Sequence, residues 1–245
     1  MIISTINVGR IIGLWRYPVK SMGPEALDVV DISWFGLAGD RRWAFVRNDA
    51  IQSGFPWLTI RECANMQNYQ PTFVDPSRPD KSATVVRTPS GKLLELDDPE
   101  LGAALYSGGA QVIKQNRGNF DTFPLSLITT ETIAGLENIA GFPLNVQRFR
   151  PNFLVETNNS KPFPEDQWIG SILRIGSLRF RLDKRDGRCA VINVDPATSE
   201  KNPEVLRAVA SQREGCLGAY GTVVTPGKVA IGDTVFLEMP VDQVD

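Results

Sequence analysis

Short segments of alternating apolar and polar residues, each ended by a turn-forming residue, constrain the fold of this chain most. In the run from Leu178 to Leu182, apolar side chains alternate with two arginines. This pattern predicts a strand with one buried face, joined through Gly176-Ser177 in a hairpin to the segment 172–175. Many such segments, separated by Gly, Pro, Asn and Asp, are typical of a β-barrel. The other expected strands are 8–15, 27–34, 43–47, 72–74, 84–87, 221–224, 229–231 and 235–237.

Two longer stretches carry helix signals. One begins near Thr130, has apolar residues at the i, i+3, i+7 spacing of one buried face, and ends at Gly141. The other has Asn202 as its N-cap and Pro203 at its first helical position. A third, shorter helix is expected over residues 97–104. We expect these helices to pack outside the barrel or across its mouth.

The length of the chain, 245 residues, allows one large β-rich domain or two half-size units, and we favour two. The least hydrophobic junction before the second half lies over residues 115–121, and the polar segment 75–81 predicts an exposed loop. We therefore expect an α+β fold that is mainly β. The two units are predicted over residues 1–118 and 119–245, and the second is expected to be a barrel with a few short packed helices.

Charge and residue content exclude several classes of protein. A net charge of −2, from 26 basic and 28 acidic residues, gives no general field for nucleic acid or an anionic membrane. No apolar run reaches the length of a membrane span, so we expect a cytoplasmic protein. Because the chain has no histidine, His-based triads and imidazole zinc ligands are excluded. Any chemistry must use a thiol, a carboxylate, a hydroxyl or a cofactor.

Three cysteines, at positions 63, 189 and 216, do not make a disulfide framework and cannot supply the four thiolates of an iron-sulfur cluster. Cys189 follows Arg188 where a charged loop meets an apolar run, and a neighbouring cation favours the thiolate that binds metals or acts as a nucleophile. A free cysteine also packs as a small hydrophobe, so this alternative stays open. For Cys63 and Cys216 we expect packing or partial exposure, and a second thiolate ligand stays open as the alternative.

Three separated motifs carry groups that suit an anionic ligand. Lys20 and Ser21 present an ammonium and a hydroxyl from one turn, which together suit phosphate. Arg41 and Arg42 open an expected strand, where alternation sends them to opposite faces, so only one points inward. Arg150 can hold an oxyanion bidentately, and the asparagine two residues later can donate and accept hydrogen bonds. Such side chains are also common on solvated loops.

Two further polar positions have more than one interpretation. The helix start at Thr130 to Thr132 offers N–H groups and hydroxyls either to a phosphate or to the helix end itself. Asp195, in Val194-Asp195-Pro196, either positions water or substrate or caps the turn. The sequence does not show whether these groups converge in space.

Taken together and in this order, the motifs resemble the MOSC family, named for the C-terminal domain of molybdenum cofactor sulfurase, preceded by the N-terminal β-barrel domain that often accompanies it. The resemblance runs from about residue 6 to 237. It includes Trp168-Ile169-Gly170, Val194-Asp195-Pro196, Tyr220-Gly221 and Pro226-Gly227 besides the motifs above. It implies an N-terminal MOSC-type barrel over 1–118 and a MOSC barrel over 119–245. The characterised members that it resembles are the mitochondrial amidoxime-reducing component and its bacterial counterparts.

The resemblance implies a molybdenum cofactor, Mo-molybdopterin, with Cys189 as the protein ligand to molybdenum. Cys189 and Asp195 are then the expected catalytic residues. The residues expected to bind the cofactor are Lys20, Ser21, Arg41, Thr132, Arg150, Asn152 and Arg188. Thr132 stands where relatives often carry serine, a change that keeps the hydroxyl. An anionic pterin suits a basic pocket, and a soft thiolate suits the metal.

The activity implied by the resemblance is the two-electron reduction of small N-hydroxylated compounds, with oxygen leaving as water. Ile192-Asn193 replaces two threonines that are frequent in the family, so the polarity near the substrate is expected to differ. We expect no iron-sulfur cluster and no membrane anchor in this chain. Electrons would then come from a separate ferredoxin-, flavoprotein- or cytochrome-type partner. Pyridoxal phosphate binding is associated with the family as a whole and is tied to no residue here.

Two other functions remain open at this stage. The protein could carry molybdopterin or sulfur, with a persulfide on Cys189, to another enzyme without turnover of its own. It could also be a non-catalytic barrel with a buried Cys189.

Overall fold

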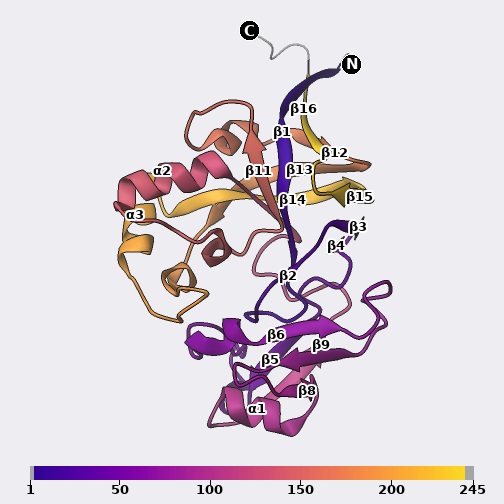
Figure 1. Ribbon diagram of the computed structural model, residues 1–245, viewed down its shortest axis with the longest axis vertical. Coiled ribbons are helices and arrows are strands. Elements are labelled where there is room, and N and C mark those ends of the chain that lie inside the picture. Colours follow the sequence, from indigo (N-terminus) through magenta and orange to yellow (C-terminus); the bar gives the residue numbers. More distant parts are fainter. Residues whose placement is uncertain (1–2, 241–245) are drawn as a thin grey trace.

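Seven strands form a closed barrel in the computed structural model, which describes residues 3–240 (Figure 1). In order around the barrel they are β11 (Phe153–Thr157), β10 (Leu125–Thr129), β14 (Cys216–Thr225), β13 (Leu178–Gly187), β12 (Ile172–Ile175), β16 (Thr234–Pro240) and β1 (Ile3–Arg16). β1 closes the ring by pairing with β11. Alternate side chains fill the interior, where the ring centroids of Phe153 and Phe180 lie 5.7 Å apart. The predicted mainly β fold is confirmed.

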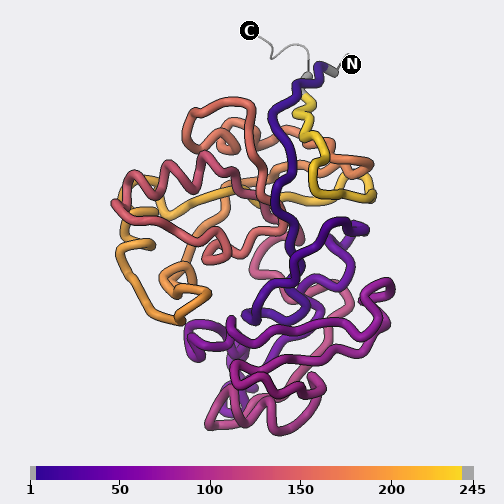
Figure 2. The backbone as a smooth tube through the Cα atoms, viewed as in Figure 1, coloured from indigo at the N-terminus to yellow at the C-terminus, as the bar shows by residue number. Residues whose placement is uncertain are grey.

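β1 brings the beginning of the chain into the barrel, alongside β16 (Figure 2). Its register shifts between Asn7 and Gly9 against β16, and between Ile11 and Gly13 against β11. A Cβ on Gly9 would lie 2.2 Å from the backbone oxygen of Glu156. Only glycine therefore lets the neighbouring strand approach this closely.

A three-stranded sheet packs its apolar face against the barrel core. In it, β3 (Val29–Ser33) pairs with β15 (Gly227–Ala230) on one side and β4 (Gly36–Leu37) on the other, while β2 (Glu25–Ala26) pairs with the end of β1. Val30, Ile32 and Val229 are buried in the same core as the barrel strands. Strand pairing thus places β1, β3 and β4 with the second half of the chain. The domain boundary at residue 118 stays a prediction.

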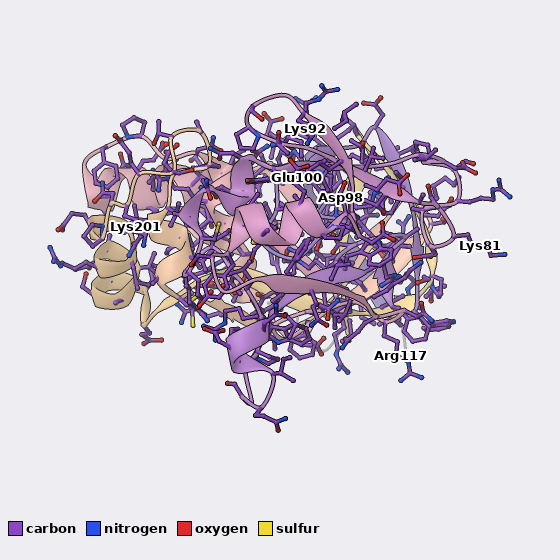
Figure 3. All side chains as sticks on the ribbon, turned by 90° about the horizontal axis from the view of Figure 1, so that it is seen from below. Lys81, Lys92, Asp98, Glu100, Arg117 and Lys201 are labelled. Carbon is purple, nitrogen blue, oxygen red and sulfur yellow. The ribbon has the colours of Figure 1, made fainter. Side chains whose placement is uncertain are left out.

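Residues 43–114, which we call the small unit, lie below the barrel in Figure 1. The small unit contains the β5 (Trp43–Arg47) and β9 (Ala110–Lys114) pair, a sheet of β6 (Gln70–Phe73), β7 (Thr84–Arg87) and β8 (Leu93–Glu95), and α1 (Pro99–Leu105). Phe45, Met66 and Leu101 are buried in a core separate from that of the barrel, to which Val19 and Met22 also contribute. On its outer face, the Lys92 ammonium lies 2.5 Å from Glu100, beside α1 (Figure 3).

Two helices pack against each other beside the barrel, α2 (Thr130–Ala140) and α3 (Glu204–Arg213). α2 begins and ends where the sequence predicts, with the Thr129 hydroxyl accepting a hydrogen bond at its start and Gly141 at φ 80° after its end. The Asn202 side chain accepts a hydrogen bond from the Glu204 N–H at 3.1 Å, but Pro203 is the N-cap of α3, which begins one residue later than predicted. Among residues 3–240, no helix has the length and apolar character needed to cross a membrane.

Several strands were not predicted from the sequence, and burial explains the clearest case. All five residues of β10 are buried, so the strand has no polar face and no alternation. β8, β9 and β11 are also additional to the predicted set, whereas β5 and β7 have the predicted bounds. β1 is longer than the predicted segment 8–15, because it pairs with two neighbours along its length.

Candidate functional site

A cavity of about 210 Å³ lies where the barrel meets the small unit, and seven of the nine site residues predicted from the sequence line it. These seven are Lys20, Ser21, Arg41, Arg150, Asn152, Arg188 and Cys189. The cavity therefore brings together motifs that are far apart in the sequence. Loop segments supply most of its wall, and the barrel strands fix where those loops begin and end.

Three of the lining residues have left-handed backbone conformations although none is glycine. Ser21 has φ 69°, Arg41 has φ 48° and Arg150 has φ 51°. The Arg41 N–H donates to the Tyr17 carbonyl at 2.6 Å, which holds this conformation. Each such residue costs about 1 kcal/mol or more, and strain of this kind gathers at functional sites. All three predicted anion-binding motifs therefore contain a strained residue at the cavity.

The left-handed turn at Arg41, and not alternation along a strand, sets the direction of the Arg41 side chain. Arg41 and Arg42 precede β5 and do not alternate along a strand. Arg42 turns away to Asp80, at 2.9 Å, while Arg41 lines the cavity. Only one of the two arginines reaches the site, as expected, but the left-handed turn separates them.

Asp40 is fully buried and accepts hydrogen bonds from three segments around the cavity. Its carboxylate accepts hydrogen bonds from the Tyr17 N–H at 2.7 Å, from the Arg41 guanidinium at 2.5 Å and from the Asn152 amide at 3.3 Å. The Asn152 side-chain oxygen in turn accepts from the Ser126 N–H at 3.1 Å. The Asn152 side chain thus connects β10 to the buried Asp40 beside the cavity.

Arg150 and Arg41 both lie over the ring of the buried Tyr17, at 4.2 and 4.6 Å from its centroid. Burial raises the pKa of Tyr17 to about 12, so the phenol is neutral. Burial, together with repulsion from Arg41, lowers the pKa of Arg150 to about 10. Both guanidinium groups remain charged at neutral pH and stack on one aromatic platform.

Most cations around the cavity have a carboxylate partner, and Arg150 does not. Arg41 pairs with Asp40, and Lys20 with Asp121 at 2.5 Å. Within the described residues 3–240, no side chain accepts a hydrogen bond from Arg150, and its Nη2 atom is buried. A buried guanidinium without a partner is costly, so an anionic ligand fits this position.

The ammonium of Lys20 is nearly buried, which lowers its pKa, while Asp121 opposes the shift. For Asp121, burial raises the pKa, but Lys20, Arg41 and Arg61 together lower it below its ordinary value. The pair is therefore charged at neutral pH, with Lys20 also donating to the Asn119 carbonyl at 3.0 Å.

The Cys189 sulfur is at the cavity wall and is held by an arginine that the sequence did not single out. The Arg61 guanidinium donates to Sγ at 3.2 Å, from the small unit. Arg61 is 128 positions away and packs over the Phe55 ring. No local pattern marks Arg61, because only the fold brings it to the thiol.

Arg188, the neighbour of Cys189, uses its guanidinium elsewhere. It donates to the backbone carbonyls of Leu217 and Phe149, both at 2.8 Å, and pairs with Asp186 at 2.9 Å. These bonds join β13, β14 and the turn before Arg150, and so fix the direction of the chain into Cys189. The predicted cofactor contact of Arg188 stays a prediction.

Asp195 and Thr132 do not line the cavity. Asp195 accepts hydrogen bonds from two N–H groups of its own turn and pairs with Arg148 at 2.5 Å. Burial raises its pKa, but these bonds outweigh it and lower the pKa below its ordinary value. Thr132 is fully buried and donates to Glu165 at 2.7 Å. Both side chains therefore bond to neighbouring protein groups, and the threonines that line the cavity are Thr59 and Thr122.

The described residues contain no group of three or more Cys, Asp, Glu or His side chains placed to hold a metal ion. Cys189 alone could supply one thiolate from the wall. A metal here would need its other ligands from an organic group, and such a group would have to be anionic to suit Arg150, Arg41 and Lys20.

Two family models match most of the chain. The model of the MOSC domain matches residues 114–236, and that of the MOSC N-terminal beta barrel domain matches residues 8–98. The chain belongs to the MOSC family. As a MOSC protein, it has the cysteine at the cavity wall within the matched MOSC domain and Arg61 within the matched N-terminal domain.

Among curated relatives, the molybdenum cofactor sulfurase of Drosophila mojavensis is 30% identical over 84% of this chain and 30% of its own length. The mitochondrial amidoxime-reducing component 1 of Danio rerio is 30% identical over 47% of this chain and 37% of its own length. This MOSC protein thus spans less than half the length of either relative. The crystal structure of the YUAD protein from Bacillus subtilis has the same fold, with a TM-score of 0.53, 14% identity, and coverage of 98% of this chain and 100% of that one.

Proposed function

We propose that this MOSC protein binds Mo-molybdopterin in the cavity and reduces small N-hydroxylated compounds by two electrons, which a separate redox protein supplies. The observation that carries the proposal is the unpartnered guanidinium of Arg150 in the same cavity as the Cys189 thiol. An anionic cofactor that brings its own sulfur ligands for molybdenum would satisfy both. The relatives named as amidoxime-reducing component and molybdenum cofactor sulfurase support the choice of cofactor and reaction.

Within this proposal each residue has a distinct task. Cys189 is the protein ligand to molybdenum, and Arg150, Arg41, Lys20 and Ser21 bind the phosphate and pterin. The cofactor, when bound, supplies the redox chemistry. The chain supplies orientation, a basic wall that retains the anion, and a partly enclosed space that limits competing reactions.

Arg61 has the task of holding the thiol in place. It approaches Sγ from the small unit, so the two parts of the protein meet at the reacting side of the cavity. Phe55 supports the guanidinium from one side. The small unit thereby forms a wall against which a substrate would lie.

The test is metal analysis with a panel of N-hydroxylated compounds, using protein from cells that make the cofactor. Wild type is expected to contain molybdenum and to reduce members of the panel anaerobically with a chemical reductant. Cys189→Ser is expected to lose both. Cys63→Ser is the matched control, because Cys63 is partly buried in the small unit and lies outside the cavity lining.

Two results would contradict the proposal. One is wild-type protein without molybdenum, with a Cys189 thiol inert to alkylation, as expected of a non-catalytic barrel. The other is molybdenum content that is unchanged by Cys189→Ser.

A second function, carriage of the cofactor or of sulfur on Cys189, is favoured by the relatives named molybdenum cofactor sulfurase, one of which aligns with 84% of the chain. It predicts bound molybdenum or a persulfide without reduction of any compound in the panel. It also predicts that a partner molybdoenzyme loses activity when this protein is removed.

A further inference from the structure

Asp186 lies in the cavity wall and has no role in the binding tasks described above. It stands on β13 and is 2% exposed. Arg188 holds one of its oxygens, Oδ2, at 2.9 Å. The other oxygen, Oδ1, is buried and has no hydrogen-bond partner among the described residues. A buried carboxylate oxygen without a partner is costly, and it is free to carry a proton.

Neighbouring groups shift the pKa of Asp186 in opposite directions. Arg188 just after β13, Tyr220 on β14 and Arg41 before β5 favour the ionised form, whereas Asp121 disfavours it. Burial outweighs the cations and raises the pKa of Asp186 to about 6. Tyr220 is itself half-buried, and its pKa is raised by burial and by Asp186, so the phenol stays protonated. Asp186 therefore exchanges its proton close to neutral pH, as a general acid must.

The proposed reaction needs such a group. Reduction of R–NH–OH to R–NH₂ and water breaks the N–O bond and consumes two electrons and two protons. A chain without histidine has to find its proton donor elsewhere. Asp195 does not qualify, because its carboxylate is held by Arg148 and by its own turn outside the cavity lining.

We propose that Asp186 is the general acid of this site and delivers one proton from Oδ1 to the oxygen that leaves as water. The electrons come from the reduced redox partner, and the second proton comes from solvent. Asp186 is reprotonated from solvent after each turnover, while Arg188 keeps its position throughout. This role rests on the proposed reductase function.

The test compares Asp186→Asn, which keeps the shape but cannot donate a carboxyl proton, with Asp186→Glu. Asp183→Asn is the matched control, because Asp183 lies on the same strand, accepts from Arg181 and Thr222 and does not line the cavity. Each protein is loaded with cofactor, and its molybdenum content is measured. Reduction of an N-hydroxylated arylamidine by a chemical reductant is then followed from about pH 5 to 8.

For wild type and Asp183→Asn we expect the rate to fall as pH rises above about 6, because the donor is then ionised. Asp186→Asn is expected to load molybdenum normally, to lose about 100-fold in rate and to lose the fall with pH. Asp186→Glu should recover part of the rate, and its rate should again decrease as pH rises. In cofactor-free protein, a carbon-13 carboxyl resonance that titrates near 6 is expected in wild type and absent in Asp186→Asn.

Each contrary result is distinct. An Asp186→Asn protein with wild-type rate and pH profile overturns the role of Asp186 and leaves the reductase function standing. Absence of a carboxyl that titrates near 6 in the cofactor-free protein also overturns it. Loaded wild type that reduces no N-hydroxylated compound overturns the proposed function and this role with it.

Discussion

Arg150 combines two unfavourable features that an anionic ligand would compensate. It has φ 51°, and its buried Nη2 atom lacks a hydrogen-bond partner within residues 3–240. Replacing it with glycine removes both costs, so we expect the cofactor-free Arg150→Gly protein to unfold within about 1 kcal/mol of wild type, or at higher denaturant. Its retention of cofactor should fall by about 10- to 100-fold, as expected for loss of charge-assisted hydrogen bonds.

Urea unfolding and pterin content after gel filtration measure these two effects. Lys81→Gln is the control for loss of one positive charge, because Lys81 is exposed at the edge of the small unit (Figure 3). Wild-type retention in Arg150→Gly would rule out Arg150 as an anchor of the cofactor.

The raised pKa of Asp186 also has a consequence for stability. Between about pH 4 and 6 the folded protein keeps a proton that the unfolded chain has released, so stability falls as pH rises through this range. A rise in pKa from the ordinary 3.8 to about 6 corresponds to about 3 kcal/mol. The unfolding free energy of cofactor-free wild type should therefore decline by up to that amount relative to Asp186→Asn, as measured by urea unfolding at several pH values. Parallel curves for the two proteins would contradict this.

The sequence predicts seven residues of the cavity wall, but not the partners that complete it. Lys20, Arg41 and Cys189 lie in motifs whose chemistry is readable locally. Arg61 and Asp186 are ordinary charged residues in sequence, and they gain their roles only from burial or from contact with a distant segment. The resemblance implies a cofactor contact for Thr132, and in the structure its hydroxyl donates to Glu165.

At the scale of elements, β1 depends on a glycine for its place between two strands. A Cβ on Gly9 would lie 2.2 Å from the Glu156 backbone oxygen, and strand pairing fixes the backbones of both residues. We expect Gly9→Ala to lower the free energy of unfolding by about 3 kcal/mol or more. Gly54→Ala, with nothing within 4 Å of the added carbon, should change it by less than about 0.5 kcal/mol. Equal effects of the two substitutions in urea unfolding would contradict this.

Elements with one buried face were predicted well, and elements without a distinct face were not. The hairpin of β12 and β13 and the helix α2 carry alternation or helical spacing, and both are confirmed. β10 is buried throughout, so its residues show no period. Its neighbours, β14 and the parallel strand β11, come from other parts of the chain, which local patterns do not reveal.

At the scale of the whole molecule, the two parts of the chain are interwoven. β1 closes the barrel of the second half, and the sheet that holds β3 and β4 also contains β15. The small unit has a separate core, but Val19 and Met22 from the preceding segment are part of it, and the unit supplies Arg61 to the cavity. Sequence composition predicts a boundary near residue 118, but it cannot show that the first strand of the chain pairs with β11 and β16.

This interweaving leads to a prediction about fragments. Residues 119–245 alone lack the closing strand, so β11 and β16 would each present an unpaired edge, and the fragment should aggregate or fail to unfold cooperatively. Ile3 pairs with Pro240, so a short flexible linker after residue 240 can reattach residues 3–37 where β1 to β4 belong. We expect that fusion to be soluble and to unfold cooperatively by circular dichroism, while it lacks Arg41 and Arg61 and binds the cofactor weakly. Cooperative unfolding of residues 119–245 without the added strands would show that the barrel closes in another way.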